Sequence, residues 1–162
     1  MKVILGIDIG GSTTKIVGLR TDGSVVSMLR VKAEDQLTSL YGALGNYLIS
    51  NGLSLEDVQQ IVLTGVGASY VDKDIYGIPT CKVDEFSASC AGALALSGQD
   101  SAVVVTMGTG TAFLWADKDG TVRHLAAAVL AEVRWAACAA NWWIWNASAR
   151  SRNWLSRAIS QR

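Results

Sequence analysis

The sequence predicts an α/β fold in which a mixed sheet begins with three antiparallel strands and is flanked by helices. Two observations carry this prediction. Three apolar runs, at residues 3–9, 15–19 and 25–31, are separated by a Gly/Ser/Thr turn and by an Asp-Gly turn, and the latter is a strong hairpin signal. Further along the chain, segments with helical spacing alternate with strand-like segments. The expected element order is βββαβαββ.

The first helix is expected at residues 37–49, where leucines recur at helical spacing and Asn51-Gly52 supplies a C-terminal stop. A helix of small residues is expected at 87–96. The remaining elements follow from short apolar runs and glycine turns. They are a strand at 61–63 with a Gly-rich loop at 64–67, strands at 103–105 and 112–115 around a Gly/Thr turn, and a hairpin turn at 119–120.

The composition favours an ordinary globular protein. The chain has 162 residues, of which 50% are hydrophobic, enough for one domain with a core. It has no apolar run of membrane-spanning length and no signal-peptide pattern at its start, so we expect a cytoplasmic location and neither membrane nor nucleic-acid partners. Its three cysteines, Cys81, Cys90 and Cys138, lack metal-ligand spacing, so we expect thiols rather than disulfides or a zinc site.

A change of composition divides the chain near residue 125. Residues 1–120 carry 8 basic and 13 acidic side chains, whereas residues 121–162 carry 6 and 1. All 16 glycines precede residue 121, and five of the six tryptophans follow it. We therefore expect a first lobe at 1–125 and an atypical Trp/Arg/Ala-rich tail at 126–162.

The turn after the first strand has the residues of a phosphate-binding loop. Glycines allow backbone N–H groups to approach phosphate oxygens, hydroxyls add donors, and an acid at the strand end, Asp8, can hold Mg²⁺ through water. A Gly-rich hairpin without a ligand, with Lys15 facing solvent, is the alternative. The candidate phosphate-binding residues are Gly10, Gly11, Ser12, Thr13 and Lys15.

A second Gly/Thr turn follows about a hundred residues later, again between two expected strands. Two hairpin turns that face each other across a cleft can hold the β- and γ-phosphates of a nucleotide from both sides, which a single loop cannot do. The pair of turns therefore favours ATP binding more strongly than either turn alone. The candidate residues of the second turn are Gly108, Thr109, Gly110 and Thr111.

These two turns resemble the phosphate motifs of the actin-like ATPase superfamily, whose lobes have a ribonuclease H-like fold. Within it, the segment at residues 83–89, which contains Glu85, resembles type II pantothenate kinase. The resemblance covers residues 2–125. It implies MgATP-dependent phosphorylation of pantothenate, the first step of coenzyme A synthesis, with ATP and Mg²⁺ as cofactors and full-length relatives that are homodimers.

The resemblance also implies catalytic residues. Glu85 would be the general base that takes the proton of the substrate hydroxyl, and Arg123 would stabilise charge on the transferred phosphoryl group. His124 occupies the register of the family arginine, and Arg123 matches it only with a shift of one residue. A structural alternative for Glu85 is a role at the N-terminus of the following helix.

The tail departs from the family pattern, in which a Gly-rich helix start and a second lobe follow residue 125. The codons for residues 130–134, read from their third bases, can encode Gly-Gly-Gly-Thr. We therefore expect that a frameshift near residue 126 replaced the second lobe, and that this chain has weak or no transferase activity. A Trp-rich helix that covers the lobe is the alternative.

Two other functions fit the same motifs. One is an ATP-dependent activator of 2-hydroxyacyl-CoA dehydratases, a class that resembles this chain in its opening turn and in which cysteines bridge an iron–sulfur cluster between subunits. Cys90 lies near a suitable place in the sequence. The other is a non-catalytic ATP-binding lobe.

Overall fold

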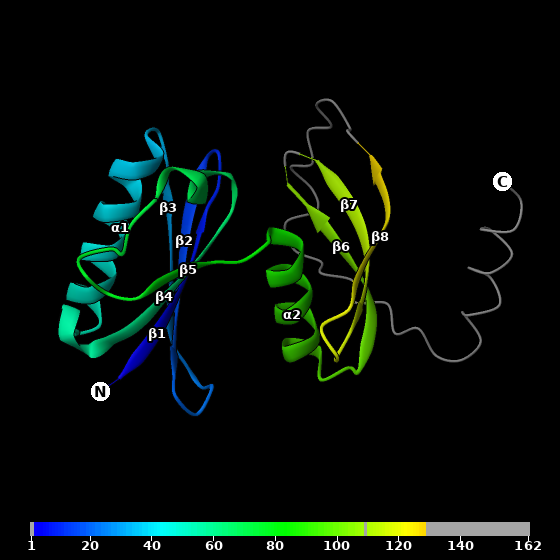
Figure 1. The fold of residues 1–162 in the computed structure, drawn as a ribbon, viewed down its shortest axis with the longest axis horizontal. Helices are drawn as coiled ribbons and strands as arrows, with labels where there is room; N and C mark the ends of the chain where they lie inside the picture. The colour runs from blue at the N-terminus through cyan, green and yellow to red at the C-terminus, as the bar shows by residue number, and fades with distance from the viewer. Residues whose placement is uncertain (1, 109, 129–162) are drawn as a thin grey trace, which may run out of the picture. The chain divides into compact units, whose positions relative to one another are not determined.

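A computed structural model describes residues 2–108 and 110–128, and the structural statements below concern these residues. The chain divides into two units, Met1–Glu85 and Phe86–Arg162. Each unit has its own sheet, shown in blue to green and in green to yellow in Figure 1. The units are described one at a time.

The first unit contains a five-stranded sheet in the order β3-β2-β1-β4-β5. The central strand β1 pairs antiparallel with β2 and parallel with β4, so the sheet is mixed. The β1–β2 and β2–β3 pairs confirm the three antiparallel strands expected at the start of the chain. The strands are β1 (Val3–Ile9), β2 (Thr13–Arg20), β3 (Val25–Lys32), β4 (Val58–Thr64) and β5 (Thr80–Lys82).

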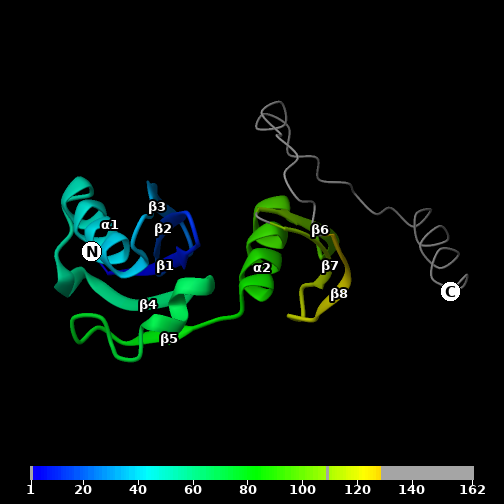
Figure 2. The same cartoon turned by 90° about the horizontal axis from the view of Figure 1, so that it is seen from above.

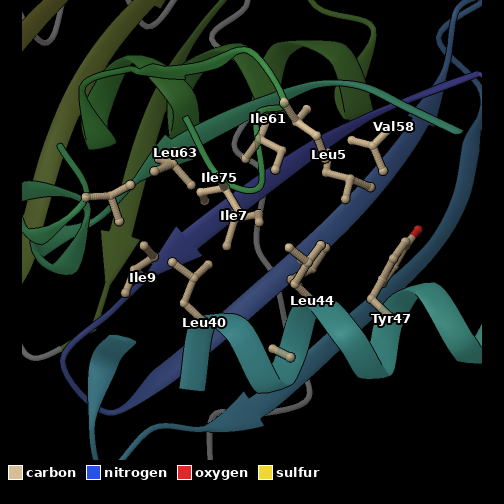
Figure 3. Close-up of a cluster of buried hydrophobic side chains, with 14 of the residues drawn as sticks. Leu5, Ile7, Ile9, Leu40, Leu44, Tyr47, Val58, Ile61, Leu63 and Ile75 are labelled. Carbon is tan, nitrogen blue, oxygen red and sulfur yellow. The ribbon is translucent and has the colours of Figure 1, made fainter. Parts of the chain in front are cut away.

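The helix α1 (Gln36–Ser50) packs on one face of this sheet (Figure 3). It begins at Asp35, whose side chain accepts a hydrogen bond of 2.7 Å from the backbone N of Thr38 and so satisfies a first-turn donor. Its leucines at helical spacing meet alternate residues of β1 and β4. The core between helix and sheet includes Leu5, Ile7, Ile9, Leu40, Leu44, Tyr47, Ile61 and Leu63.

The second unit is a three-stranded antiparallel sheet in the order β6-β7-β8, with α2 packed on one face (Figures 1 and 2). The buried residues of this small core are Cys90 of α2 and Ala112, Leu114 and Ala116 of β7. The elements are α2 (Glu85–Ser97), β6 (Ser101–Met107), β7 (Thr111–Asp117) and β8 (Val122–Ala128).

The structure adds elements to the expected order βββαβαββ. Strand β5 has only three residues and follows Pro79, too little for a pattern of alternation to be recognised. The other additions are β8 and two 3₁₀ helices, η1 (Leu55–Asp57) and η2 (Val66–Tyr70). Strand β8 continues to Ala128, three residues beyond the expected boundary at residue 125. The tail expected at 126–162 lies, from residue 129 onward, outside the described residues, and this domain boundary stays a prediction.

None of the helices in the described part of the chain is long and apolar enough to cross a membrane.

Candidate functional site

The β1–β2 turn is held in shape by backbone hydrogen bonds. The N–H of Gly10 donates to the carbonyl oxygen of Thr13 at 3.0 Å, and Ala33 donates to the carbonyl oxygen of Ser12 at 2.9 Å. A Cβ at Gly10 would lie 2.9 Å from the Thr13 oxygen, so the turn itself requires this glycine. Gly11 differs, because no described atom lies within 4 Å of its Cβ position. The turn therefore leaves space beside Gly11 in which a ligand can approach the backbone.

A polar row crosses three strands next to this turn. Side chains alternate along a strand, and Ile7 and Ile9 are buried beneath α1, so Asp8 lies on the opposite face of the sheet. Asp8 is paired in register with Lys15 of β2 on one side and with Thr64 of β4 on the other. We call Lys15, Asp8 and Thr64 the polar row. It lies where the parallel strands β1 and β4 end, the edge at which α/β sheets commonly bind ligands.

Asp8 and Lys15 form an ion pair within this row. The Lys15 Nζ lies 2.6 Å from Asp8 Oδ2, and the two side chains are 52% and 27% exposed. Lys15 is thus held beside the glycine turn, rather than directed only to solvent. A cation and a partly exposed carboxylate at one strand end can bind, respectively, a phosphate group and the water shell of Mg²⁺.

The loop after β4 packs against the end of β1. Gly65 has φ 85° and ψ 170°, a conformation that is essentially confined to glycine. A Cβ at Gly65 would collide with Asp8 Oδ1, and one at Gly67 would collide with the side chain of Ile9. Because these contacts require glycine, the loop at residues 64–67 is part of the surroundings of Asp8.

The sequence placed Thr64 in a Gly-rich loop that resembles a family loop near the active cleft, but it did not identify Thr64 as a site residue. Its hydroxyl oxygen is buried and has no hydrogen-bond partner among the described residues. The available signal was its position at the end of a strand parallel to β1, level with Asp8.

The second predicted turn joins β6 to β7. The N–H of Gly108 donates to the carbonyl oxygen of Gly110 at 2.8 Å, and Met107 pairs with Thr111 across the turn. No described atom lies within 4 Å of a Cβ position at Gly108 or Gly110, so this turn also leaves space for a ligand. Thr109 lies outside the described residues. The two turns belong to different units, and their cooperation around one nucleotide stays a prediction.

Glu85 is the first residue of α2 and is exposed. As the first helical residue it does not occupy the capping position, but its charge lies in the first turn, where the helix dipole favours an acid. At this position Glu85 can act either as the expected general base or as an acid that stabilises the N-terminus of α2.

The neighbouring residues Arg123 and His124 of β8 lie on opposite faces of the second sheet. His124 pairs with Leu114, which is buried beneath α2, and its ring centroid is 5.7 Å from that of Phe86 in α2. Arg123 pairs with Trp115, whose side chain alternates with that of Leu114 and so points to the other face. The residue on the α2 face is therefore His124, although Arg123 was the predicted catalytic residue. The role of either residue stays a prediction.

The described residues contain no cluster of three or more His, Cys, Asp or Glu side chains with which to hold a metal directly. The polar row nevertheless fits Mg²⁺, which keeps several waters and takes one or two carboxylates together with phosphate oxygens. Asp8 would be the carboxylate of such a site.

The first unit, with its mixed sheet and a glycine turn between its first two strands, has the expected α/β fold, which is also that of actin-like ATPase structures. The chain belongs to the BadF/BadG/BcrA/BcrD ATPase family, whose profile matches residues 5–127. These findings confirm the expected fold and an ATPase family. They do not support the narrower resemblance to type II pantothenate kinase.

Solved structures share this fold. The activator of 2-hydroxyisocaproyl-CoA dehydratase from Clostridium difficile, with bound ADPNP, has a TM-score of 0.62 and 23% identity over 78% of this chain and 44% of its own. Component A of (R)-2-hydroxyglutaryl-CoA dehydratase from Acidaminococcus fermentans has a TM-score of 0.62 and 20% identity over 75% and 45%.

A protein from Chromobacterium violaceum assigned as an N-acetylglucosamine kinase has a TM-score of 0.55 and 20% identity over 76% and 48%. The chain thus spans less than half the length of each of these three structures. No curated protein matches its sequence significantly.

Proposed function

We propose that this chain is the phosphate-binding part of an ATPase and that MgATP binds at the β1–β2 turn. The observation that carries the proposal is the Asp8–Lys15 ion pair beside a glycine turn that is open at Gly11. Family membership supports it, because the matched region contains both the turn and the polar row.

Each residue of the site has a distinct part in this binding. Lys15 donates hydrogen bonds to phosphate oxygens, while the backbone of Gly11 and Ser12 approaches them from the turn. Asp8 holds Mg²⁺ through its water shell, and the ion neutralises phosphate charge. The turn at Gly108, Gly110 and Thr111 is the candidate for a second set of phosphate contacts.

Calorimetric titration of the 162-residue chain with MgATP tests this proposal. Lys15→Met keeps the aliphatic stem and removes the charge, and we expect MgATP affinity to fall by about tenfold or more, since a charge-assisted hydrogen bond is lost. Lys118→Met is the matched control, because Lys118 forms a similar exposed ion pair, 3.0 Å from Asp100, in the second unit. Equal affinities of both variants and the parent chain would count against the site.

The reaction of the whole protein has two candidates. Dehydratase activation is supported by the family match, in agreement with the two dehydratase-related structures of the same fold. Phosphorylation of pantothenate is supported by the exposed position of Glu85 at the start of α2 and by the resemblance of the surrounding sequence. Pantothenate-dependent release of ADP distinguishes them. MgATP binding without any turnover would identify a non-catalytic lobe.

The buried position of Cys90 does not fit a cluster that bridges two subunits. Cys90 is 1% exposed and packs against Ala112 and Leu114 in the core of the second unit, so it cannot bridge to another subunit without unfolding that core. Cys81 is exposed on β5 in the first unit, where it accepts a hydrogen bond of 3.5 Å from Gln60. No step of the proposed function is therefore assigned to such a cluster.

A further inference from the structure

The hydroxyl of Thr64 is a buried polar group without a hydrogen bond in the described structure. Such a group normally costs free energy, and a second state of the protein in which the hydroxyl gains a partner would account for it. Thr14 has a hydroxyl in the same condition. The two differ in position, since Thr14 pairs with Ile9 on the face covered by α1, whereas Thr64 pairs with Asp8 in the polar row.

The carboxylate of Asp8 has one oxygen on each side of β1. Oδ2 accepts from Lys15 on the β2 side. Oδ1 lies on the β4 side, where it contacts the position that a Gly65 side chain would occupy. Thr64 immediately precedes Gly65 and is the register partner of Asp8. Thr64 therefore flanks Asp8 from the β4 side, the side of the carboxylate oxygen that Lys15 does not use.

A bound phosphate group competes for Lys15. The Lys15 side chain is half exposed and its stem is flexible, so its ammonium group can turn from Asp8 to a phosphate oxygen. Asp8, which is only 27% exposed, then loses its cation partner. A carboxylate with limited access to water is stabilised by any available donor. Rotation of Thr64 between staggered χ1 wells can supply that donor.

We propose that Thr64 is a positioning residue for Asp8, and that its hydroxyl donates a hydrogen bond to the Asp8 carboxylate when Lys15 turns to a phosphate. The inference rests on the proposed function and deepens it, because it names the partner that holds Asp8 in place in the nucleotide-bound state. Asp8 thereby keeps one neighbour in each state, Lys15 from β2 without nucleotide and Thr64 from β4 with it.

Urea unfolding of four proteins tests the exchange of partners without any nucleotide. They are the parent chain, Thr64→Val, Lys15→Met and the double variant. In the parent chain Thr64→Val removes a hydroxyl without a partner, and we expect the unfolding midpoint to stay or rise. In Lys15→Met the hydroxyl has Asp8 as its partner, and we expect Thr64→Val to lower the midpoint. The same shift in both backgrounds would overturn the proposal, because non-additivity is the signature of coupling.

Two controls separate this coupling from packing. Thr14→Val removes another buried hydroxyl without a partner and should shift the midpoint equally in both backgrounds, because Thr14 lies on the α1 face. Thr64→Ser keeps the hydroxyl and should behave in Lys15→Met as the parent threonine does. A Thr64→Ser variant whose midpoint shift depends on the Lys15 background as strongly as that of Thr64→Val would show that the coupling does not come from the hydroxyl and would overturn the proposal.

MgATP titration provides a second measurement. Thr64→Val should lower the affinity for MgATP about tenfold, the value of a hydrogen bond to a charged group, and should also lower the affinity for metal-free ATP, because a phosphate takes Lys15 from Asp8 in both cases. Equal MgATP affinity of Thr64→Val and the parent chain would overturn the positioning role. If the parent chain binds no MgATP, the proposed function fails, whereas the unfolding comparison still decides whether Thr64 is coupled to Asp8.

Discussion

Lys15 Nζ lies 2.6 Å from Asp8 Oδ2, across the antiparallel pair β1–β2 and next to the turn that joins these strands. The ion pair holds the ammonium group of Lys15 in a defined position beside the glycine turn. A phosphate group that takes this cation must compete with Asp8, and a magnesium ion bound by Asp8 removes that competition. Nucleotide and metal are therefore expected to bind together rather than independently.

The first prediction concerns this joint binding. Asp8→Asn removes the carboxylate charge, and we expect MgATP affinity to fall by about tenfold or more because a charged ligand-binding group is lost. Affinity for ATP in the presence of EDTA should stay equal or increase, because Lys15 is no longer held and a repelling charge is gone. Titration in both buffers measures the two effects. Asp100→Asn, in the second unit, is the control expected to change neither, and a parallel loss in both buffers for Asp8→Asn would contradict the metal role.

The second prediction concerns the loop after β4. Gly65→Ala places a Cβ against Asp8 and the end of β1 in a backbone conformation that other residues avoid, and we expect a loss of about 3 kcal/mol or more in the free energy of unfolding. Gly23→Ala is matched in φ, 84° against 85°, but has no described atom within 4 Å of its Cβ position. Gly23→Ala should therefore lower the free energy of unfolding only by the cost of the backbone conformation, about 1–2 kcal/mol. Urea denaturation measures both values, and equal losses would show that the contact with Asp8 is unimportant.

Much of the fold could be predicted because its signals are local. The hairpin around Gly23 and the leucine spacing of α1 are visible within short windows of the sequence. Strand β5 was missed because three residues show no periodicity, and its place is set by pairing with β4, which is a tertiary contact.

The candidate site was predictable only in part, because only some of its residues are neighbours in the sequence. Asp8 and the glycine turn are close together in the chain and form a recognisable motif. Thr64 is 56 residues further on, and only the parallel register of β1 and β4 brings it level with Asp8. The choice between Arg123 and His124 likewise depends on which face of β8 each residue takes, and the bulge between the Phe113 and Leu114 pairings changes that register.

The third prediction concerns acid stability. The backbone N–H of Ser54 donates to Asp57 Oδ2 at 2.9 Å, and this bond is the largest of several causes, the Ser54 hydroxyl among them, that lower the pKa of Asp57 from 3.8 to about 2. A carboxylate whose pKa is lower in the folded state contributes stability above its unfolded pKa and loses it as pH falls through the folded pKa.

We therefore expect Asp57→Asn to be less stable than the parent chain above pH 4, and the difference to shrink between pH 3.8 and about 2. Urea unfolding at pH 6, 4, 3 and 2 measures it. A difference that stays constant over this range would mean that the Ser54 bonds do not depend on the charge of Asp57.

The fourth prediction concerns the two described cysteines and bears on the cluster expected for dehydratase activators. In a Cys138→Ser background, Cys81 should react readily with a maleimide because its side chain is exposed on β5. Cys90 should react only at the rate at which the second unit opens, because it is buried between α2 and β7. Mass spectrometry of the labelled peptides over time distinguishes the two thiols, and Cys81→Ser isolates the slower one.

Urea below the unfolding midpoint should accelerate Cys90 labelling and leave Cys81 labelling nearly unchanged. Rapid labelling of Cys90 in the native protein would mean that the core around Leu114 is open, and a cluster ligand at this position would then again be a reasonable hypothesis.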